Sequence, residues 1–584
     1  MKPKRPPPVS GPPPVGKPSG APPIAQNSQT SGNRENEIAV GLNPQDNQQE
    51  QKVSSQQEKT QIAREIEKDL EKENEKKENE KDKENEKQQG HPQEKQEETW
   101  EKTVEEDDEE GSSEEKIPYE PPPELLWNLC EQLQKSFWTE MTSQRQFKRR
   151  TDYVLVRKLG NYAPSIELFL GLQKHALSEI LEPNRYLSGL QFDNFTIRSA
   201  IGKGVVTIET PYTTNLMDAQ SNIDAALDTM IEVGTTKQIR VLSYGALPFD
   251  TFDAQMISPI YHFFSLYNSI GPAWASMAYV ARDRLVVQVT KDEVLDFLYI
   301  GQLMEPVFLA LFGHSPIIFG KDTYRHCGNQ WLLDGMFESS RELRRFGIEP
   351  PRSSLAAGRI SMPQHPVLSW QQLTEEFVKA DKLMHRDAEG WLEMFSGRFL
   401  DFLEQDGTDI PIHWKDHVCF SWGPVSVDMD QSTISFQSAD QQPFEYRSCF
   451  AALVLGILER RKEILHFIDG FMPEPPWRIP FGLRQHEIVQ RELDKIKDPW
   501  PPFWEWRKIA LEKGICNTKI PFTGLLEGVI EEATTGLIRR GLGEEVLLKP
   551  IWNKFHRDET NELRRMFYHC EKEDFLSHVE VVAS

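Results

Sequence analysis

The stretch 282–316 runs RDRLVVQVTKDEVLDFLYIGQLMEPVFLALFGHSP. Residues 285–289 form a short run of aliphatic residues around one glutamine, which predicts a strand. Residues 293–312 are long and strongly apolar, and Gly313 and Pro316 follow them directly. Because glycine and proline commonly stop a helix, the sequence predicts a long apolar helix that ends at residue 312.

Similar patterns on both sides of this stretch predict further strands and helices. Strands are expected at 153–156, 205–209 and 239–244, with strand-like alternation over 425–436. Helices are expected at 124–141, with a basic end over 145–150, at 218–233, at 450–467 and through most of the last hundred residues. Strands and helices mix without a regular βαβ rhythm, which favours an α+β fold with a largely antiparallel sheet.

The N-terminal part differs from the rest in composition. Residues 1–120 contain one Trp, one Tyr and no Phe, and hold 18 Lys and Arg against 29 Asp and Glu. Such a segment cannot bury enough apolar surface to offset the entropy lost on ordering. We therefore expect a disordered tail over 1–118, which is first Pro-rich, then Glu/Lys-rich and finally acidic, followed by one folded domain over 119–584.

Charge and cysteine usage exclude several classes of protein. A net charge of −24 gives no bulk attraction for nucleic acid, although Arg145 and 148–150 form a small basic patch. The six cysteines show no CxxC pair, which favours reduced thiols. The N-terminus lacks the apolar core of a secretory signal, and no apolar run has the length of a membrane helix. We therefore expect a cytoplasmic protein that binds neither nucleic acid nor membranes.

Familiar catalytic motifs are absent from the sequence. It contains no GxxxxGK[ST] loop, no GxGxxG after a strand and no GxSxG elbow. His413 and His417 are four residues apart, but the segment lacks the Glu of a zinc-protease motif, so we expect them to be ordinary hydrogen-bonding residues. The Trp-rich segment 500–506 is expected to start a helix that its aromatic side chains anchor in the core.

A longer pattern resembles the glutamate–cysteine ligase family of the plant and bacterial type, which includes carboxylate–amine ligases. Four segments in order carry the resemblance: 204–211 (GVVTIETP), 282–289 (RDRLVVQV), 311–316 (LFGHSP, with Gly320 and Trp331 downstream) and 536–550 (GLIRRGLGEEVLLKP). The resemblance implies a glutamine-synthetase-like fold, a curved and mostly antiparallel sheet whose concave face holds the active site. It also implies ATP-dependent amide formation, in which ATP phosphorylates a carboxylate and an amine then attacks the acyl phosphate.

The resemblance further implies a set of site residues. Mg²⁺ would need carboxylates on neighbouring strands, and the phosphoryl group would need cationic or hydrogen-bonding side chains. The matching positions are Asp152 and Glu209 as metal ligands, Glu209, Gln288, Arg325 and Asp440 as catalytic residues, and Ser315 and Lys321 for ATP binding. The expected ligands are ATP, Mg²⁺ and a small amino acid or amine.

The sequence departs from the family where the chemistry is expected. The family has a Glu and an Arg in its last sheet strand, where this chain has Ser435 and Gln437. Arg149 and Arg150 stand near positions where the family has acidic residues. Losing one such donor typically costs about 10²–10³ in rate, so losing several predicts a poor ligase unless other side chains substitute. Candidate substitutes are Asp428, Asp430, His314 and Lys321.

Two function classes therefore stay open at the sequence level. The first is a divergent ATP-dependent carboxylate–amine ligase. The second is an inactive ligase-fold protein that acts as a binding or scaffold module, with a protein partner for its Pro-rich and acidic tail. A structural role is an alternative for each residue taken alone: Glu209 could pair with a cation, Gln288 could bond a buried backbone group, and Asp440 could cap the helix after Pro443.

Overall fold

The computed structural model describes much of the chain from residue 122 onward. The described residues are 122–141, 144–337, 343–348, 369–386, 392–405, 410–419, 424–471, 501–515 and 520–581. The predicted tail, 1–118, and its boundary with the folded domain lie outside these residues. All statements below concern the described part.

A nine-stranded sheet forms the centre of the structure, and every pairing in it is antiparallel. Its strands are β1 (Phe147–Val156), β2 (Ser178–Leu181), β3 (Leu187–Gln191), β4 (Thr196–Ser199), β5 (Val205–Glu209), β6 (Arg240–Leu242), β7 (Arg282–Gln288), β12 (Val425–Asp428) and β13 (Thr433–Asp440). The spatial order is β12-β13-β7-β1-β5-β4-β3-β2, with β6 paired to β1. Together with the surrounding helices, this confirms the predicted α+β class.

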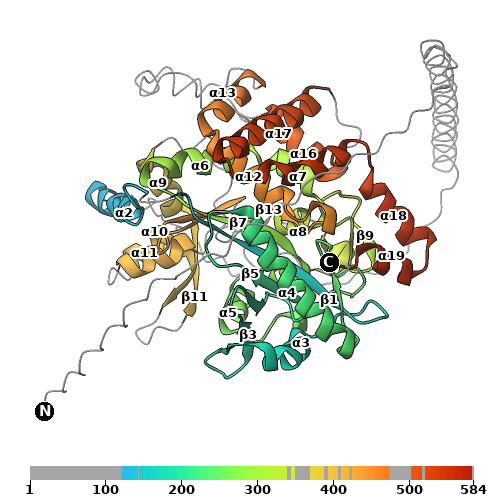
Figure 1. The fold of residues 1–584 in the computed structure, drawn as a ribbon. Helices are drawn as coiled ribbons and strands as arrows, with labels where there is room; N and C mark the ends of the chain where they lie inside the picture. The colour runs from blue at the N-terminus through green and yellow to red at the C-terminus, as the bar shows by residue number, and fades with distance from the viewer. Residues whose placement is uncertain are drawn as a thin grey trace, which may run out of the picture. The chain divides into compact units, whose positions relative to one another are not determined.

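Helices pack on both faces of the sheet, and Figure 1 shows α4 lying across one of them. The helices are α2 (Pro123–Lys135), α3 (Ser165–Leu172), α4 (Leu216–Lys237), α5 (Tyr261–Ile270), α6 (Lys291–Leu303), α7 (Glu305–Phe312), α8 (Gly328–Phe337), α9 (Trp370–Lys379), α10 (Phe399–Gln405), α11 (Ile410–Cys419), α12 (Cys449–Glu459), α13 (Arg461–Phe471), α16 (Pro501–Lys513), α17 (Ile520–Arg540), α18 (Glu559–His569) and α19 (Lys572–Val579). Tyr153 and Leu155 of β1 pack in one apolar cluster with residues of α3 and α4. Leu285 and Val287 of β7 join a second cluster with α12 and α17.

Helices α12 and α17 approach each other unusually closely, and Figure 1 shows them side by side. A Cβ added to Gly456 would lie 2.2 Å from the carbonyl oxygen of Ala533, and one added to Gly536 would lie 2.1 Å from that of Gly456. Only glycine leaves room for this contact between backbones. The contact joins the C-terminal segment of the sequence resemblance to the buried helix next to the sheet.

The predicted apolar helix over 293–312 is divided in two. Helices α6 and α7 meet at Met304 with a bend of 51°. Pro306 lies in the first turn of α7, where its missing N–H leaves no broken hydrogen bond, and this explains why a new helix starts there. No described helix is by itself long and apolar enough to cross a membrane, while the bent pair α6–α7 meets that test of length and composition only when taken together.

One local prediction was wrong, and one was refined. Residues 145–150 do not extend the first helix, because α2 ends at Lys135 and 147–150 begin β1. His413 and His417 lie on α11, where His417 hydrogen-bonds the carbonyl of Phe377. The helix expected over 450–467 divides at Arg460 into α12 and α13.

Shorter elements complete the described fold. They are the hairpins β8–β9 (Ile317–Ile318 and Lys321–Asp322) and β10–β11 (Asp381–Arg386 and Leu392–Arg398), and the 3-10 segments η3 (Pro272–Tyr279), η4 (Leu343–Phe346) and η7 (Glu544–Phe555). Helix α16 starts within the predicted Trp-rich segment, and its Trp506 packs against the main core. This contact confirms the predicted anchoring role of that tryptophan.

Candidate functional site

The strand register places polar side chains on the sheet face opposite the helices α4 and α12. In an antiparallel pair, residues directly opposite each other share a face, and alternate residues along one strand share it too. Arg150 lies opposite Glu209 on β5 and opposite Arg284 on β7. Asp152 lies opposite Thr207. We call this surface the polar face; it carries Lys148, Arg150, Asp152, Thr207, Glu209, Arg282, Arg284, Gln288, Thr433, Ser435 and Asp440.

Four of the residues predicted for the site lie on this polar face. They are Asp152 on β1, Glu209 on β5, Gln288 on β7 and Asp440 on β13, and the first and last of them are 288 positions apart in the chain. Gln288 lies at the end of its strand opposite Thr433. The structure therefore brings these four residues to one surface.

Glu209 is held by two cationic side chains. Lys148 Nζ lies 2.5 Å from its Oε1, and Arg150 Nε lies 3.1 Å from its Oε2. Burial raises the pKa of Glu209, but Arg150 and Lys148 outweigh burial and lower the pKa overall. Glu209 is therefore a paired carboxylate anion.

Asp152 is also occupied on both oxygens. Its Oδ1 accepts hydrogen bonds from Thr207 Oγ1 at 2.6 Å and from Arg284 Nη2. Its Oδ2 accepts from the backbone N–H of Arg282 at 3.2 Å. The side chain is buried, so these bonds fix its orientation.

Mg²⁺ does not fit these two carboxylates as they are arranged here. A magnesium ion needs oxygen ligands that point at it in near-octahedral geometry. Glu209 and Asp152 instead point at three cations, Lys148, Arg150 and Arg284. Within the described residues, no group of three or more His, Cys, Asp or Glu side chains is placed to hold a metal ion. The predicted metal-ligand role of the pair therefore has no geometric support.

Arg282 is the unusual residue of the polar face. It is only 7% exposed, and its Nη2 finds no hydrogen-bond partner among the described residues. Burial lowers the pKa of its guanidinium, and the neighbouring Arg284 lowers it further. The Nε of Arg284 likewise has no partner in the described part of the chain. The charges of Asp440 and Asp152 raise the pKa of Arg282 against these effects. A buried donor without an acceptor is costly, so the two unsatisfied nitrogen atoms form a site suited to an anion.

Asp440 ends β13 in a buried network with the turn after α7. Its Oδ2 accepts from Ser315 Oγ at 2.5 Å and from the backbone N–H of His314 at 2.7 Å. Burial raises the pKa of Asp440 against the effect of these hydrogen bonds. Ser315 is fully buried and in turn accepts from the N–H of Asn329 at 3.0 Å. The network ties a strand to a turn, and Asp440 does not cap the following helix as the alternative reading suggested.

The other predicted residues lie elsewhere. Arg325 follows β9, and its Nη1 pairs with Glu512 of α16 at 2.7 Å, so the structure does not bring it to the polar face. Lys321 lies exposed on the β8–β9 hairpin. Of the candidate substitutes, Asp428 lies at the edge of the polar face, where it accepts from the N–H of Asp430 and caps the turn between β12 and β13.

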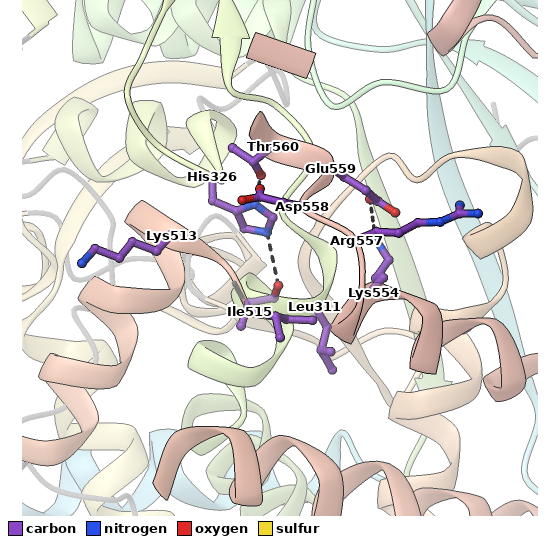
Figure 2. Close-up of a pocket in the computed structure, with 10 residues that line it drawn as sticks. Leu311, His326, Lys513, Ile515, Lys554, Arg557, Asp558, Glu559 and Thr560 are labelled. Carbon is purple, nitrogen blue, oxygen red and sulfur yellow. Dashed lines mark hydrogen bonds and ion pairs between the residues drawn. The ribbon is translucent and has the colours of Figure 1, made fainter. Parts of the chain in front are cut away.

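A second cluster of charged side chains lies beside α18, and Figure 2 shows it in close-up. The buried Lys554 donates to Glu559 at 3.2 Å and to Gln442 at 3.0 Å. Burial raises the pKa of Glu559, but Lys554 outweighs it and the pKa falls to about 2. His326 contacts Thr560 and the carbonyl of Ala310 in the same pocket. Because the cavity measures about 20 Å³, it has room for roughly one water molecule and not for a substrate.

The sequence analysis missed the cations that dominate the polar face. Lys148 and Arg150, and Arg282 and Arg284, are spaced by two, which on a strand puts each pair on one face. That spacing was the feature of the sequence that could have predicted two cations on one face of each strand. The nearby Arg149 points to the helical side, where it is 1% exposed and pairs with Asp283 at 2.9 Å. Lys148 and Arg149 of the small basic patch noted in the sequence are therefore buried.

Comparison with known proteins gives only distant similarity. No family model matches the chain, and no curated protein matches it either. A bifunctional glutathione synthetase from Pasteurella multocida is 12% identical with a TM-score of 0.38; the match covers 78% of this chain and 53% of that one. The chain thus spans about half the length of that protein. A glutamate–cysteine ligase from Francisella tularensis, solved in complex with AMP, is 10% identical with a TM-score of 0.41, over 76% of this chain and 88% of that one. TM-scores below 0.5 do not establish a common fold.

Proposed function

We propose that this is a ligase-like protein whose polar face binds a small carboxylate- or phosphate-bearing molecule through Arg282 and Arg284. The observation that carries the proposal is the buried Arg282 guanidinium, whose Nη2 has no partner among the described residues. An anion bound there would supply a hydrogen-bond acceptor to this atom. Arginine suits this role because its planar fork matches the two oxygens of a carboxylate or phosphate.

The surrounding charges support the same ligand class. Lys148 and Arg150 neutralise Glu209, and Arg284 neutralises Asp152. Arg282 lies opposite Asp440 in the strand register, and the charges of Asp440 and Asp152 raise the pKa of its guanidinium, but its Nη2 makes no hydrogen bond in the described part of the chain. An anionic group that accepts from this atom would therefore be held by a buried arginine with a second arginine beside it.

One candidate activity is the ligation implied by the sequence resemblance. In that reaction ATP phosphorylates a substrate carboxylate, such as that of an amino acid, and an amine displaces the phosphate to form an amide. The placement of Asp152, Glu209, Gln288 and Asp440 on one face of a mostly antiparallel sheet supports this candidate. In this candidate activity, Arg282 would orient the substrate carboxylate before the reaction and neutralise its charge.

The second candidate is binding without ligation. It is favoured by the pairing of Asp152 and Glu209 with cations, because phosphoryl transfer from ATP ordinarily requires Mg²⁺ held by carboxylates. Ser435 and Gln437, which replace a Glu and an Arg of the family pattern, favour it as well. Recruitment of a protein partner by the tail belongs to this candidate and remains a prediction. Anion binding is common to both candidates and is our conclusion.

Calorimetric titration of the full chain tests the proposal. Glutamate, phosphate and MgATP are titrated into the wild-type protein, into Arg282→Met and into Arg398→Met, a control on β11 away from the polar face. We expect at least one anion to bind the wild type and the control and not Arg282→Met. Binding of none of them up to about 10 mM would refute the proposal.

A second measurement separates the two candidates. ADP release is followed with MgATP, glutamate and a panel of amines that includes cysteine. Amine-dependent ADP release that disappears in Arg282→Met establishes the ligase. Anion binding without ADP release supports the binding protein.

A further inference from the structure

A third buried polar atom lies beside the two unsatisfied arginine nitrogens of the polar face. The hydroxyl of Ser438 on β13 has no hydrogen-bond partner in the described part of the chain, and the residue is 4% exposed. The Nη2 of Arg282 and the Nε of Arg284 both belong to β7. Figure 1 shows that β7 and β13 are neighbouring strands. Three donors without an acceptor among the described residues therefore come from two adjacent strands.

A β-bulge places Ser438 opposite Arg284. The register of β13 on β7 shifts between Phe436 and Ala439, which pair with the residues on either side of Arg284. Residues 437–438 therefore lie opposite this one arginine, the two-against-one arrangement that defines a bulge. Bulges commonly occur next to functional sites, where they redirect a side chain. Here the bulge brings an additional hydroxyl to the arginine.

Strand alternation puts the Ser438 side chain on the same side of the sheet as the polar face. The next residue, Ala439, belongs to the apolar cluster that contains α12 and α17, on the opposite side. Asp440, which follows, lies on the polar face opposite Arg282. Because side chains alternate between the two faces along a strand, Ser438 shares the face of Asp440. The serine hydroxyl and the guanidinium groups of Arg282 and Arg284 therefore lie on one surface.

The two carboxylates nearest to these donors are already engaged. Asp440 accepts from Ser315 Oγ at 2.5 Å on one oxygen and from Cys327 Sγ at 3.4 Å on the other. Asp152 accepts hydrogen bonds on both of its oxygens. Neither acid satisfies Arg282 Nη2 or the Ser438 hydroxyl, so an acceptor for these atoms would have to come from a ligand.

We infer that the anionic group bound at the polar face is tetrahedral, a phosphate or sulfate group, and that Ser438 is the residue that selects it. The inference rests on the proposed function and adds a third contact to its two arginines. A phosphate group has three strong acceptor oxygens, one for each of the three donors. A carboxylate has only two, and the two arginines suffice to use them. Since neighbouring strands lie about 4.7–4.9 Å apart, the Ser438 hydroxyl donates from a different direction than the arginines.

Calorimetric titration of the full chain tests the inference with anions of both shapes. Phosphate and sulfate are the tetrahedral probes, and acetate and glutamate are the planar ones. We expect phosphate or sulfate to bind at least about tenfold more tightly than either carboxylate. Methyl phosphate then identifies the source of the group: binding as tight as that of phosphate indicates a phosphate ester, and much weaker binding indicates the free ion.

A serine variant and a matched control locate the selectivity. Ser438→Ala should weaken the tetrahedral probes about tenfold, the usual effect of losing one hydrogen bond to a charged group, and should leave the carboxylates unchanged. The control is Ser258→Ala, after the 3-10 segment η2 (Ala254–Met256), because Ser258 is also buried and its hydroxyl also lacks a partner in the described part. It should change no affinity. Ser438→Ala should not lower the urea midpoint of the free protein, because its hydroxyl bonds no described residue.

The possible failures are distinguishable. If no probe of either shape binds up to about 10 mM, the proposed function fails, and this inference fails with it. If a carboxylate binds as tightly as phosphate, or if Ser438→Ala binds phosphate as the wild type does, the inference is overturned and the anion site stands. A lower urea midpoint for Ser438→Ala would also overturn it, because the hydroxyl would then have a partner within the protein.

Discussion

Two buried arginines on neighbouring strands should respond in opposite ways to the same substitution. Arg149 on β1 is 1% exposed, and Arg282 on β7 is 7% exposed. Arg149 pairs with Asp283 at 2.9 Å and donates to Gln220 at 2.7 Å. The Nη2 of Arg282 makes no hydrogen bond in the described part of the chain, although the charges of Asp440 and Asp152 raise the pKa of its guanidinium. Methionine has a similar length and no charge, so it serves as the replacement at both sites.

The structure sets the expected magnitudes. Arg149→Met leaves Asp283 buried and without its partner, and breaking a buried ion pair in this way typically costs about 3–5 kcal/mol. Arg282→Met removes a buried charge whose desolvation penalty is several kcal/mol and breaks no ion pair. We therefore expect Arg149→Met to lower the free energy of unfolding by about 3–5 kcal/mol, and Arg282→Met to leave it unchanged or raise it.

Urea unfolding of the full chain, followed by tryptophan fluorescence, measures both effects. Repeating it with saturating ligand adds a second comparison. At about 100 times Kd, a ligand should stabilise the wild type by about 2.7 kcal/mol and should not stabilise Arg282→Met. If Arg282→Met destabilises the free protein as much as Arg149→Met does, the guanidinium already has a partner, and the argument for an anion site fails.

Three further predictions concern buried groups elsewhere. Burial lowers the pKa of His314 and His417 to about 3 and that of His326 to about 4. As the pH drops, the unfolded chain therefore binds protons on these histidines before the folded chain does. The free energy of unfolding should fall between about pH 6.5 and pH 4, by about 1.4 kcal/mol per pH unit for each histidine. A urea midpoint that stays constant over this range would contradict the prediction. Burial also lowers the pKa of Lys382 to about 8, although its ammonium lies 4.4 Å from the centre of a phenylalanine ring. Lys382→Met should raise the melting temperature at pH 7 and raise it less at pH 10, where the lysine is neutral in the folded state; an equal shift at both values would count against a burial penalty. Gly456→Ala should lower the free energy of unfolding by about 1–3 kcal/mol, since its methyl group would lie 2.2 Å from a backbone oxygen; an unchanged urea midpoint would show that α12 and α17 can move apart.

Much of the sheet could be predicted from apolar periodicity, but its first strand could not. The predicted strand over 205–209 has the same bounds as β5, because Val205, Val206 and Ile208 make its apolar pattern clear. In the first strand, Phe147 is followed by Lys148, Arg149 and Arg150, and an apolar pattern is visible only from Tyr153 onward. A run of charged residues like this one also occurs on the exposed side of a helix, so the sequence alone does not distinguish the two. The carboxylates that pair with Lys148 and Arg149 in the sheet are Glu209 and Asp283, which lie far along the chain.

The residues of the candidate site could be predicted, but their charged neighbours could not. The resemblance named Asp152, Glu209, Gln288 and Asp440, and the strand register places all four on one face. Sequence spacing could not show that cations surround the first two. Nor could it show that Arg325 turns toward α16, because that depends on how a loop is packed.

The position of β1 in the sheet has a consequence for how the chain folds. Its two main neighbours are β5, which follows soon after it, and β7, which follows about 130 residues later. Arg149 also donates to the carbonyl of Arg447, 298 positions away. At roughly 5–20 residues per second, a ribosome needs about 15–60 s to make that stretch. The edge of β1 that pairs with β7 stays open until β7 is made, and β13, which pairs with β7, comes later still. Contacts between such distant residues also slow folding, because the intervening loop must be ordered before they form.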